Sequence, residues 1–326
     1  MCEHEDNKYT QHVLFESHFY GETRGLAVHP RDLICATSGD DKTVRVWDMT
    51  SHKCVASAIL NSFVRSLAYS PSGHHLACGT GGRFKGTSTG PQGHVVVLDT
   101  FSMKPSRTLK DPKKWIRVLT YSPDGAWLAV GSQDYNIYIY DTDDEYRLRY
   151  VLRRHNSHVS CLDFTEDSKY LRSVCGGNEL LFWDVRRGKA MPGGATALRD
   201  EMWHTTTCPL VWSTQGVLES DPKNLCVSRN ERSDLVVCGD SKGTLSLLNF
   251  PCPKSPWSRS EFPGHGSYIP CVRFTRRDVY VVSVGGADRS IFQWRVQRDE
   301  EKTPETLDAT KSSHETSFSY VVCVIL

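Results

Sequence analysis

One unit of sequence recurs along this chain, and such repetition constrains the fold more than any other feature. Each copy has three short runs rich in Val, Ile, Leu and Tyr, separated by turn residues such as Ser-Pro-Asp-Gly. Runs of this kind predict β-strands joined by tight hairpins. The copies are LAVHPRDLICATSGDDKTVRVWD (26–48), LAYSPSGHHLACGT with HVVVLD (67–80 and 94–99), LTYSPDGAWLAVGSQDYNIYIYD (119–141), LDFTEDSKYLRSVCGGNELLFWD (162–184), VSRNERSDLVVCGDSKGTLSLLN (227–249) and VRFTRRDVYVVSVGGADRSIFQWR (272–295).

The spacing of the copies predicts an all-β fold, a β-propeller of the WD40 type. The last residues of their third strands are 42 to 65 residues apart, close to the ~40–45 residues of a WD unit. One long spacing contains a Gly-rich stretch at 79–94, which indicates a hairpin insertion. The other contains residues 197–218, enough for about two extra strands. We therefore expect six clear blades, and 197–218 is either an incomplete, degenerate seventh blade or a long hairpin.

The two ends of the repeat region suggest how the ring closes. The segment HVLFESH (12–18) has the character of a strand, and no fourth strand is evident between Trp294 and the charged stretch that follows it. We expect the N-terminal strand to complete the last blade, because a closed ring leaves no open sheet edges. The predicted organisation is a flexible N-terminus at 1–11, a propeller at 12–296 and a C-terminal tail at 297–326, polar as far as residue 316 and apolar in its last ten residues.

Polar residues recur at the turn before the third strand. Three copies have an Asp six residues before the aromatic that ends the strand, while the fourth copy has Gly177 at this position. In WD repeats such an Asp belongs to a buried, hydrogen-bonded chain with His, Ser or Thr, and Trp, and a satisfied buried carboxylate is a structural group. We therefore predict a structural role in the blades for Asp41, Asp134, Asp288, His265, Trp47, Trp183 and Trp294.

The sequence shows no sign of catalytic, cofactor or metal chemistry. It has no G-x-x-x-x-G-K-[ST], H-E-x-x-H or G-x-S-x-G motif. Its 12 cysteines include no Cys-x-x-Cys pair, and we interpret them as core residues of an intracellular protein. Lys and Arg number 39 against 38 Asp and Glu, a balance that argues against a dedicated nucleic-acid binder. We therefore expect that the protein is not an enzyme and that it binds no cofactor.

Two features are candidates for contact with partners. The exposed pairs Arg153 with Arg154, and Arg186 with Arg187, are expected in loops and could attract an acidic surface; ordinary surface charge is the alternative. The sequence ends Cys323-Val-Ile-Leu, which matches the C-a-a-X motif for prenylation of Cys323. An additional strand or a chance match are the alternatives, and a membrane contact is expected only if Cys323 is lipidated.

Several segments resemble the second propeller of the echinoderm microtubule-associated protein-like family. They are GLAVHP (25–30), the two YSP-containing copies, GTLSLLNFPCP (243–253), GHGSYIPCVRF (264–274) and the irregular LRDEMWHTTTCPLVW (198–212). The last segment is similar to that family's RD-x-x-W-x-T-x-T-C signature. The resemblance covers about residues 12–296, and the chain has neither the heptad stretch nor the first propeller of the family's full plan.

The resemblance implies a non-enzymatic protein-interaction scaffold in the cytoplasm, associated with the cytoskeleton. Tubulin or microtubule-associated proteins are the expected partners, because tandem propellers of this family associate with tubulin. The alternative is a general WD-repeat adaptor subunit of another complex, such as a ubiquitin ligase or a trafficking assembly.

Overall fold

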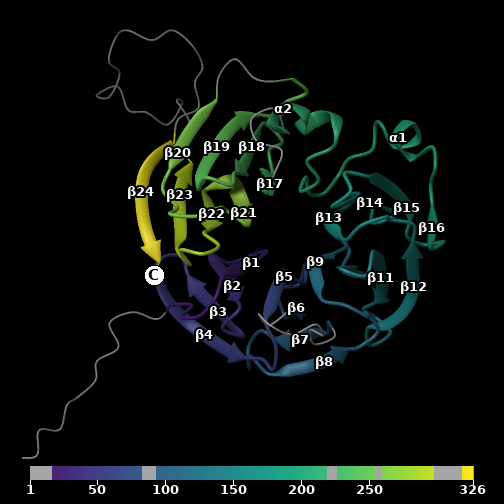
Figure 1. The fold of residues 1–326 in the computed structure, drawn as a ribbon, viewed down its shortest axis with the longest axis horizontal. Coiled ribbons are helices and arrows are strands. Elements are labelled where there is room, and N and C mark those ends of the chain that lie inside the picture. Colours follow the sequence, from purple (N-terminus) through teal and green to yellow (C-terminus); the bar gives the residue numbers. More distant parts are fainter. Residues whose placement is uncertain (1–16, 83–92, 219–225, 255–258, 297–317, 326) are drawn as a thin grey trace, which may run out of the picture.

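Six antiparallel sheets of four strands surround a central axis, as Figure 1 shows. The computed structural model describes residues 17–82, 93–218, 226–254 and 259–296, and the backbone of 318–325. In these residues the predicted WD-type propeller is confirmed, and each sheet is one blade. The innermost strands are β1, β5, β9, β13, β17 and β21 (Figure 1).

The strands follow one another in each blade from the axis outward. The first three blades are β1 (Thr23–Val28), β2 (Ile34–Gly39), β3 (Thr43–Asp48) and β4 (Lys53–Ile59); β5 (Val64–Tyr69), β6 (His75–Thr80), β7 (Val95–Asp99) and β8 (Pro105–Leu109); β9 (Ile116–Tyr121), β10 (Trp127–Ser132), β11 (Asn136–Asp141) and β12 (Arg147–Arg153). The other three are β13 (Val159–Phe164), β14 (Tyr170–Cys175), β15 (Leu180–Asp184) and β16 (Lys189–Ala190); β17 (Cys226–Arg229), β18 (Leu235–Gly239), β19 (Thr244–Asn249) and β20 (Ser260–Pro263); β21 (Cys271–Phe274), β22 (Tyr280–Val284), β23 (Ile291–Val296) and β24 (Phe318–Ile325).

The Ser-Pro-x-Gly sequences form the hairpin turns between the first two strands of a blade. Gly73 and Gly125 both have a φ of +80°, a conformation that glycine adopts without steric cost. Their N–H groups donate to the carbonyl oxygens of Ser70 and Ser122 at 2.8 and 2.9 Å. These turns reverse the chain within a few residues, so neighbouring strands of one copy pair with each other.

The hydrophobic core lies between blades, where the faces of adjacent sheets meet. Side chains of blades one and two share one buried cluster, and the same holds for blades two and three, three and four, five and six, and six and one. Because both faces of most blades are covered, the second and third strands are largely buried, as in β10 and β11. No helix in the described residues is both long enough and apolar enough to cross a membrane.

The closure of the ring differs from the prediction. The fourth strand of the last blade is β24, whose residues pair with β23 from Ile291 opposite Ile325 to Val296 opposite Phe318. Of the predicted N-terminal strand, residues 12–16 lie outside the described residues, and Ser17 and His18 belong to no strand. The expectation was wrong because the partner of β23 follows it in the sequence after a long polar stretch, which gave no sign of a returning strand.

The prediction for residues 197–218 was also wrong. They form neither a sheet nor a hairpin, but irregular chain that follows α1 (Gly194–Ala197) and contains η1 (Trp212–Thr214) and α2 (Gln215–Leu218). One isolated bridge, between Thr165 and Trp203, links this segment to blade four. We call residues 198–218 the wedge, because they lie between blades four and five (Figure 1). Cys208 packs in a cluster with blade four, and Val217 in a cluster with blade five.

A buried carboxylate fixes the wedge to blade four. Asp163 of β13 is fully buried and accepts hydrogen bonds from the hydroxyl of Thr205 at 2.7 Å, and from the backbone N–H and hydroxyl of Thr207 at 2.9 and 2.8 Å. Arg172 of β14 donates its Nε–H to the same carboxylate at 3.0 Å. The guanidinium of Arg172 also stacks on the ring of Trp203, 4.3 Å from the ring centre. The Trp and Thr positions of the signature therefore attach the wedge to the ring.

Candidate functional site

The predicted structural residues of the first blade form one hydrogen-bonded chain. The Nδ1 of His18 lies 2.9 Å from the Asp41 carboxylate, and its Nε2 lies 2.9 Å from the hydroxyl of Thr37. The indole N–H of Trp47 donates to the same hydroxyl at 2.8 Å. All four side chains are buried. Each polar atom thus has a partner inside the blade, and none is directed to a substrate.

The last blade has the same chain. The Nε2 of His265 lies 2.7 Å from the hydroxyl of Ser283, to which the indole N–H of Trp294 donates at 2.8 Å. The Nδ1 of His265 lies 2.7 Å from the hydroxyl of Ser290 and 3.5 Å from the carboxylate of Asp288. Burial lowers the pKa of His265 to about 4, although Asp288 acts in the opposite direction. The imidazole is therefore neutral in the folded protein at physiological pH.

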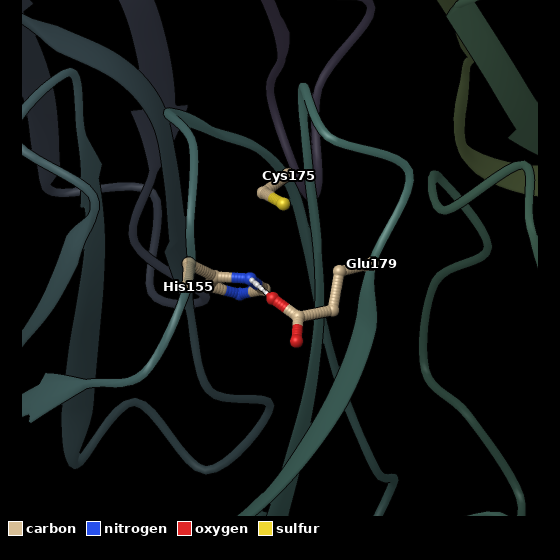
Figure 2. Close-up of side chains that lie close together, drawn as sticks. All are labelled: His155, Cys175 and Glu179. Carbon is tan, nitrogen blue, oxygen red and sulfur yellow. Dashed lines mark ion pairs between the residues drawn. The ribbon is translucent and has the colours of Figure 1, made fainter.

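In the fourth blade a different residue replaces the missing Asp. Glu179 lies two positions after Gly177, and its carboxylate comes within 3.4 Å of the Nδ1 of His155 (Figure 2). The Nε2 of His155 lies 2.7 Å from the hydroxyl of Ser173, which accepts the indole N–H of Trp183 at 2.8 Å. Glu179 thus takes the place of the Asp beside the imidazole, but its contact with His155 does not have the geometry of a hydrogen bond.

His155, Cys175 and Glu179 also form a group whose potential ligand atoms lie within 4.8 Å of one another. Figure 2 shows the imidazole and the carboxylate facing each other. The thiol of Cys175 lies 3.5 Å from the side-chain oxygen of Asn156. Since His155 and Glu179 repeat the contacts made by His265 and Asp288, we assign this group to the structure of the blade.

Asp134 of the third blade makes different contacts from those of Asp41 and Asp288. It accepts hydrogen bonds from the hydroxyl of Tyr138 at 2.7 Å and from the backbone N–H of Lys113 at 2.9 Å. Tyr140, at the position of the Trp, donates instead to Asp111 at 3.0 Å. Asp134 therefore fixes the loop between blades two and three through its contact with Lys113.

The candidate partner-binding arginines lie on two opposite faces of the ring. We call the face on which β1, β5, β9 and β13 begin the upper face, and the other the lower face. Arg153 is the last residue of β12 and Arg154 follows it before β13, on the upper face. Arg186 and Arg187 follow β15, on the lower face. All four side chains are exposed, but the two pairs do not form one surface.

A cavity of about 680 Å³ lies among the innermost strands, and its lining includes the upper-face ends of β1, β5, β9 and β13. Three arginines from consecutive blades line it, Arg24, Arg65 and Arg117, and we call them the arginine ring. Each is the extra residue of a β-bulge at the start of β1, β5 or β9. A bulge bends the strand and redirects the side chain of its extra residue. In the fourth blade Ser160 is at the corresponding bulge and also lines the cavity.

Aromatic and acidic side chains contact the guanidinium groups of the arginine ring. The guanidinium of Arg65 lies over the rings of Phe63 and Trp115, 5.4 and 5.2 Å from their centres, and that of Arg117 lies 5.5 Å from the centre of Trp115. Arg65 forms an ion pair with Asp40 at 3.0 Å, and Arg24 forms one with Glu22.

The sequence contains a sign of this ring that the search for motifs missed. Each of the three arginines stands two residues before the Leu that opens its copy of the repeat. The position is therefore the same in three copies, but it lies just before the part of the unit that repeats most clearly. A recurrent charged residue at the start of an innermost strand is the signal that could have located the cavity.

Comparisons with known proteins identify the family. The sequence model of the family described as echinoderm microtubule-associated protein second beta-propeller matches residues 23–296. The chain belongs to this family. It is 35% identical over 306 residues to the ciliary WD repeat-containing protein ctxp80 of Euplotoides octocarinatus. This alignment covers 89% of the chain and 42% of the relative.

Human relatives agree with this assignment. Echinoderm microtubule-associated protein-like 3 is 34% identical over 283 residues, or 84% of the chain and 30% of the relative. Echinoderm microtubule-associated protein-like 2 is 33% identical over 281 residues, or 84% of the chain and 42% of the relative. The chain thus spans less than half the length of these curated relatives, and the match corresponds to the second of the family's propellers.

Proposed function

We propose that this propeller is a non-enzymatic scaffold that binds tubulin or a microtubule-associated protein in the cytoplasm. The observation that carries the proposal is the family match over residues 23–296, since relatives of this chain are named microtubule-associated or ciliary proteins. A rigid ring with loops on both faces suits this role, because a rigid scaffold positions loops for contact.

The upper face is the better candidate for an acidic partner. The loop before β9 carries Lys110, Lys113 and Lys114, and the end of β12 with the loop that follows carries Arg153 and Arg154. All five side chains are exposed. Clustered positive charge on one face attracts a negatively charged partner and raises the rate of association. On the lower face, Arg187 lies 3.7 Å from Asp184, which offsets part of the charge of that pair.

Co-sedimentation with microtubules tests the proposal. We expect the full chain to sediment with microtubules, and Arg153→Glu/Arg154→Glu to weaken binding at least roughly tenfold, because each reversal replaces an attraction with a repulsion. Arg186→Glu/Arg187→Glu changes the same charge on the lower face and serves as the matched control. If only the control variant loses binding, the partner contacts the lower face. If the full chain does not sediment, the general-adaptor alternative gains support.

A further inference from the structure

We propose that the cavity at the upper face binds a compact polyphosphate, a small molecule with several phosphate groups, through the arginine ring of Arg24, Arg65 and Arg117. This inference does not depend on tubulin binding. It rests on how the three side chains are aimed, on the charge of the cavity, and on its size.

The backbone determines the direction in which the three arginine side chains point. Three successive innermost strands each contain a bulge, and the extra residue of each is an arginine that lines the cavity. Because the strands are arranged around the axis, their guanidinium groups approach the cavity from different directions. Bulges are often found beside functional sites, where they direct a side chain. The arrangement suits a ligand whose charged groups also point in several directions.

The charge of the cavity is not balanced. Of the described residues that line it, four are Arg and none is Asp or Glu; the fourth is Arg273. Glu22 and Asp40, just outside the lining, pair with Arg24 and Arg65. Among the described residues no carboxylate forms an ion pair with Arg117 or Arg273. Two positive charges therefore lie at the cavity without a matching negative charge.

Burial and mutual repulsion both disfavour the charged forms of these groups. Burial lowers the pKa of Arg65, and the neighbouring charge of Arg24 lowers it further. Burial also lowers the pKa of Arg117, with additional repulsion from Arg24 and Arg65. Like charges brought together in a partly buried site cost free energy unless an anion is bound between them. An anionic ligand would remove this cost.

The chemistry and the volume favour phosphate groups on a compact scaffold. A guanidinium donates two parallel N–H bonds to a phosphate, and stacking on aromatic rings holds the fork in position. His158 and Asn178 also line the cavity and can donate further hydrogen bonds, whereas the hydroxyl of Tyr268, another lining residue, already donates to Glu22 at 3.0 Å. About 680 Å³ is within the usual range for small-molecule sites. An extended acidic peptide presents its carboxylates along a line, which fits a ring of converging groups less well.

Isothermal titration calorimetry of the full chain with inositol hexakisphosphate tests the proposal. We expect one molecule to bind, and Arg117→Gln to weaken binding roughly 10- to 100-fold, as for the loss of one charged hydrogen-bonded pair. Arg153→Gln removes the same charge from the exposed surface and should weaken binding roughly twofold or less. Ser160→Arg adds a guanidinium at the next bulge, beside the four arginines already lining the cavity, and should tighten binding, so it tests the site even if Arg117→Gln fails to fold.

Other outcomes would overturn the proposal. Equal losses for Arg117→Gln and Arg153→Gln would show that the probe binds nonspecifically to surface charge. No binding by the full chain, or no gain from Ser160→Arg, would exclude the arginine ring as a polyphosphate site. Binding of a glutamate decapeptide that depends on Arg117, without binding of inositol hexakisphosphate, would assign the cavity to an acidic peptide instead. Inorganic phosphate, with a single group, should bind more weakly than the probe.

Discussion

Replacing Asp163 by Asn should strongly destabilise this propeller, although the change preserves the size of the side chain. Asp163 is fully buried and accepts hydrogen bonds from Arg172 at 3.0 Å and from the backbone N–H groups of Thr207 and Cys208 at 2.9 and 3.1 Å, besides two hydroxyls. An Asn side chain offers one oxygen, and its NH₂ group would face donors. It would also leave the charge of Arg172 buried without a counter-charge.

The expected cost is about 3–5 kcal/mol, the range for removing one partner of a buried ion pair. Urea unfolding at pH 7 of the wild type and of Asp163→Asn measures it. Asp184→Asn is the matched control, since its partner Arg187 lies 3.7 Å away with 79% of its side chain exposed; such a pair contributes about 0–1 kcal/mol. Equal losses for the two variants would refute the role assigned to Asp163.

The pH dependence gives a second test of the same contact. Burial alone would raise the pKa of Asp163, but Arg172 and the hydrogen bonds from the wedge outweigh it, so the pKa is lowered. A carboxylate whose pKa is lower in the folded protein contributes stability above its unfolded pKa of about 3.9 and loses it as the pH falls further. We expect Asp163→Asn to lack this part of the acid transition of the wild type.

Three further predictions concern the blades. Burial lowers the pKa of His265 to about 4, so its contribution to stability is fully present above pH ~6.5 and is lost as the pH falls towards 4. Between pH 7.5 and 5, the free energy of unfolding measured in urea should fall by about 2 kcal/mol more for the wild type than for His265→Gln. Equal losses would contradict the assignment of a neutral imidazole. Ser173→Ala removes the shared hydrogen-bond partner of His155 and Trp183 and should lower the free energy of unfolding by about 1–3 kcal/mol. If the contact between His155 and Glu179 is structural, one equivalent of Zn²⁺ should leave the melting temperature of the wild type unchanged. Deletion of residues 318–326 exposes the edge of β23 and should cause self-association in size-exclusion chromatography with light scattering; an unchanged mass would argue that β24 is dispensable.

The sequence predicted the blades because the strands of a blade are neighbours in the chain. Alternating apolar residues and the Ser-Pro-x-Gly turns are local signals, and the pairing of β9 with β10 and β11 follows from them. The position of β24 depends instead on contact with β23 across the intervening polar residues, which no local pattern specifies. The same strand includes Cys323, whose backbone lies opposite Gln293, and thus corresponds to the additional strand that was the alternative to prenylation; lipidation itself stays a prediction.

The structural residues show a similar limit. The Asp of the fourth blade was missing from its expected position, but Glu179, with a longer side chain, reaches His155 from two residues farther along. A rule based on residue spacing fails where a longer side chain, placed at a different position in the turn, reaches the same partner. The arginine ring was missed because its arginines stand just before the part of each copy that repeats most clearly, and because the extra residue of a bulge interrupts the regular alternation of a strand.

The way the chain completes its last blade has a mechanical consequence. Each of the six described sheets is one continuous stretch of sequence, so no sheet joins strands from the two ends of the repeat region. The first and last blades are held together by a shared apolar cluster and by a few contacts, such as the hydrogen bond from Thr23 N–H to Gly286 O at 2.9 Å. Force that separates β1 from β21 could therefore open the circle into an arc while every strand keeps its partners.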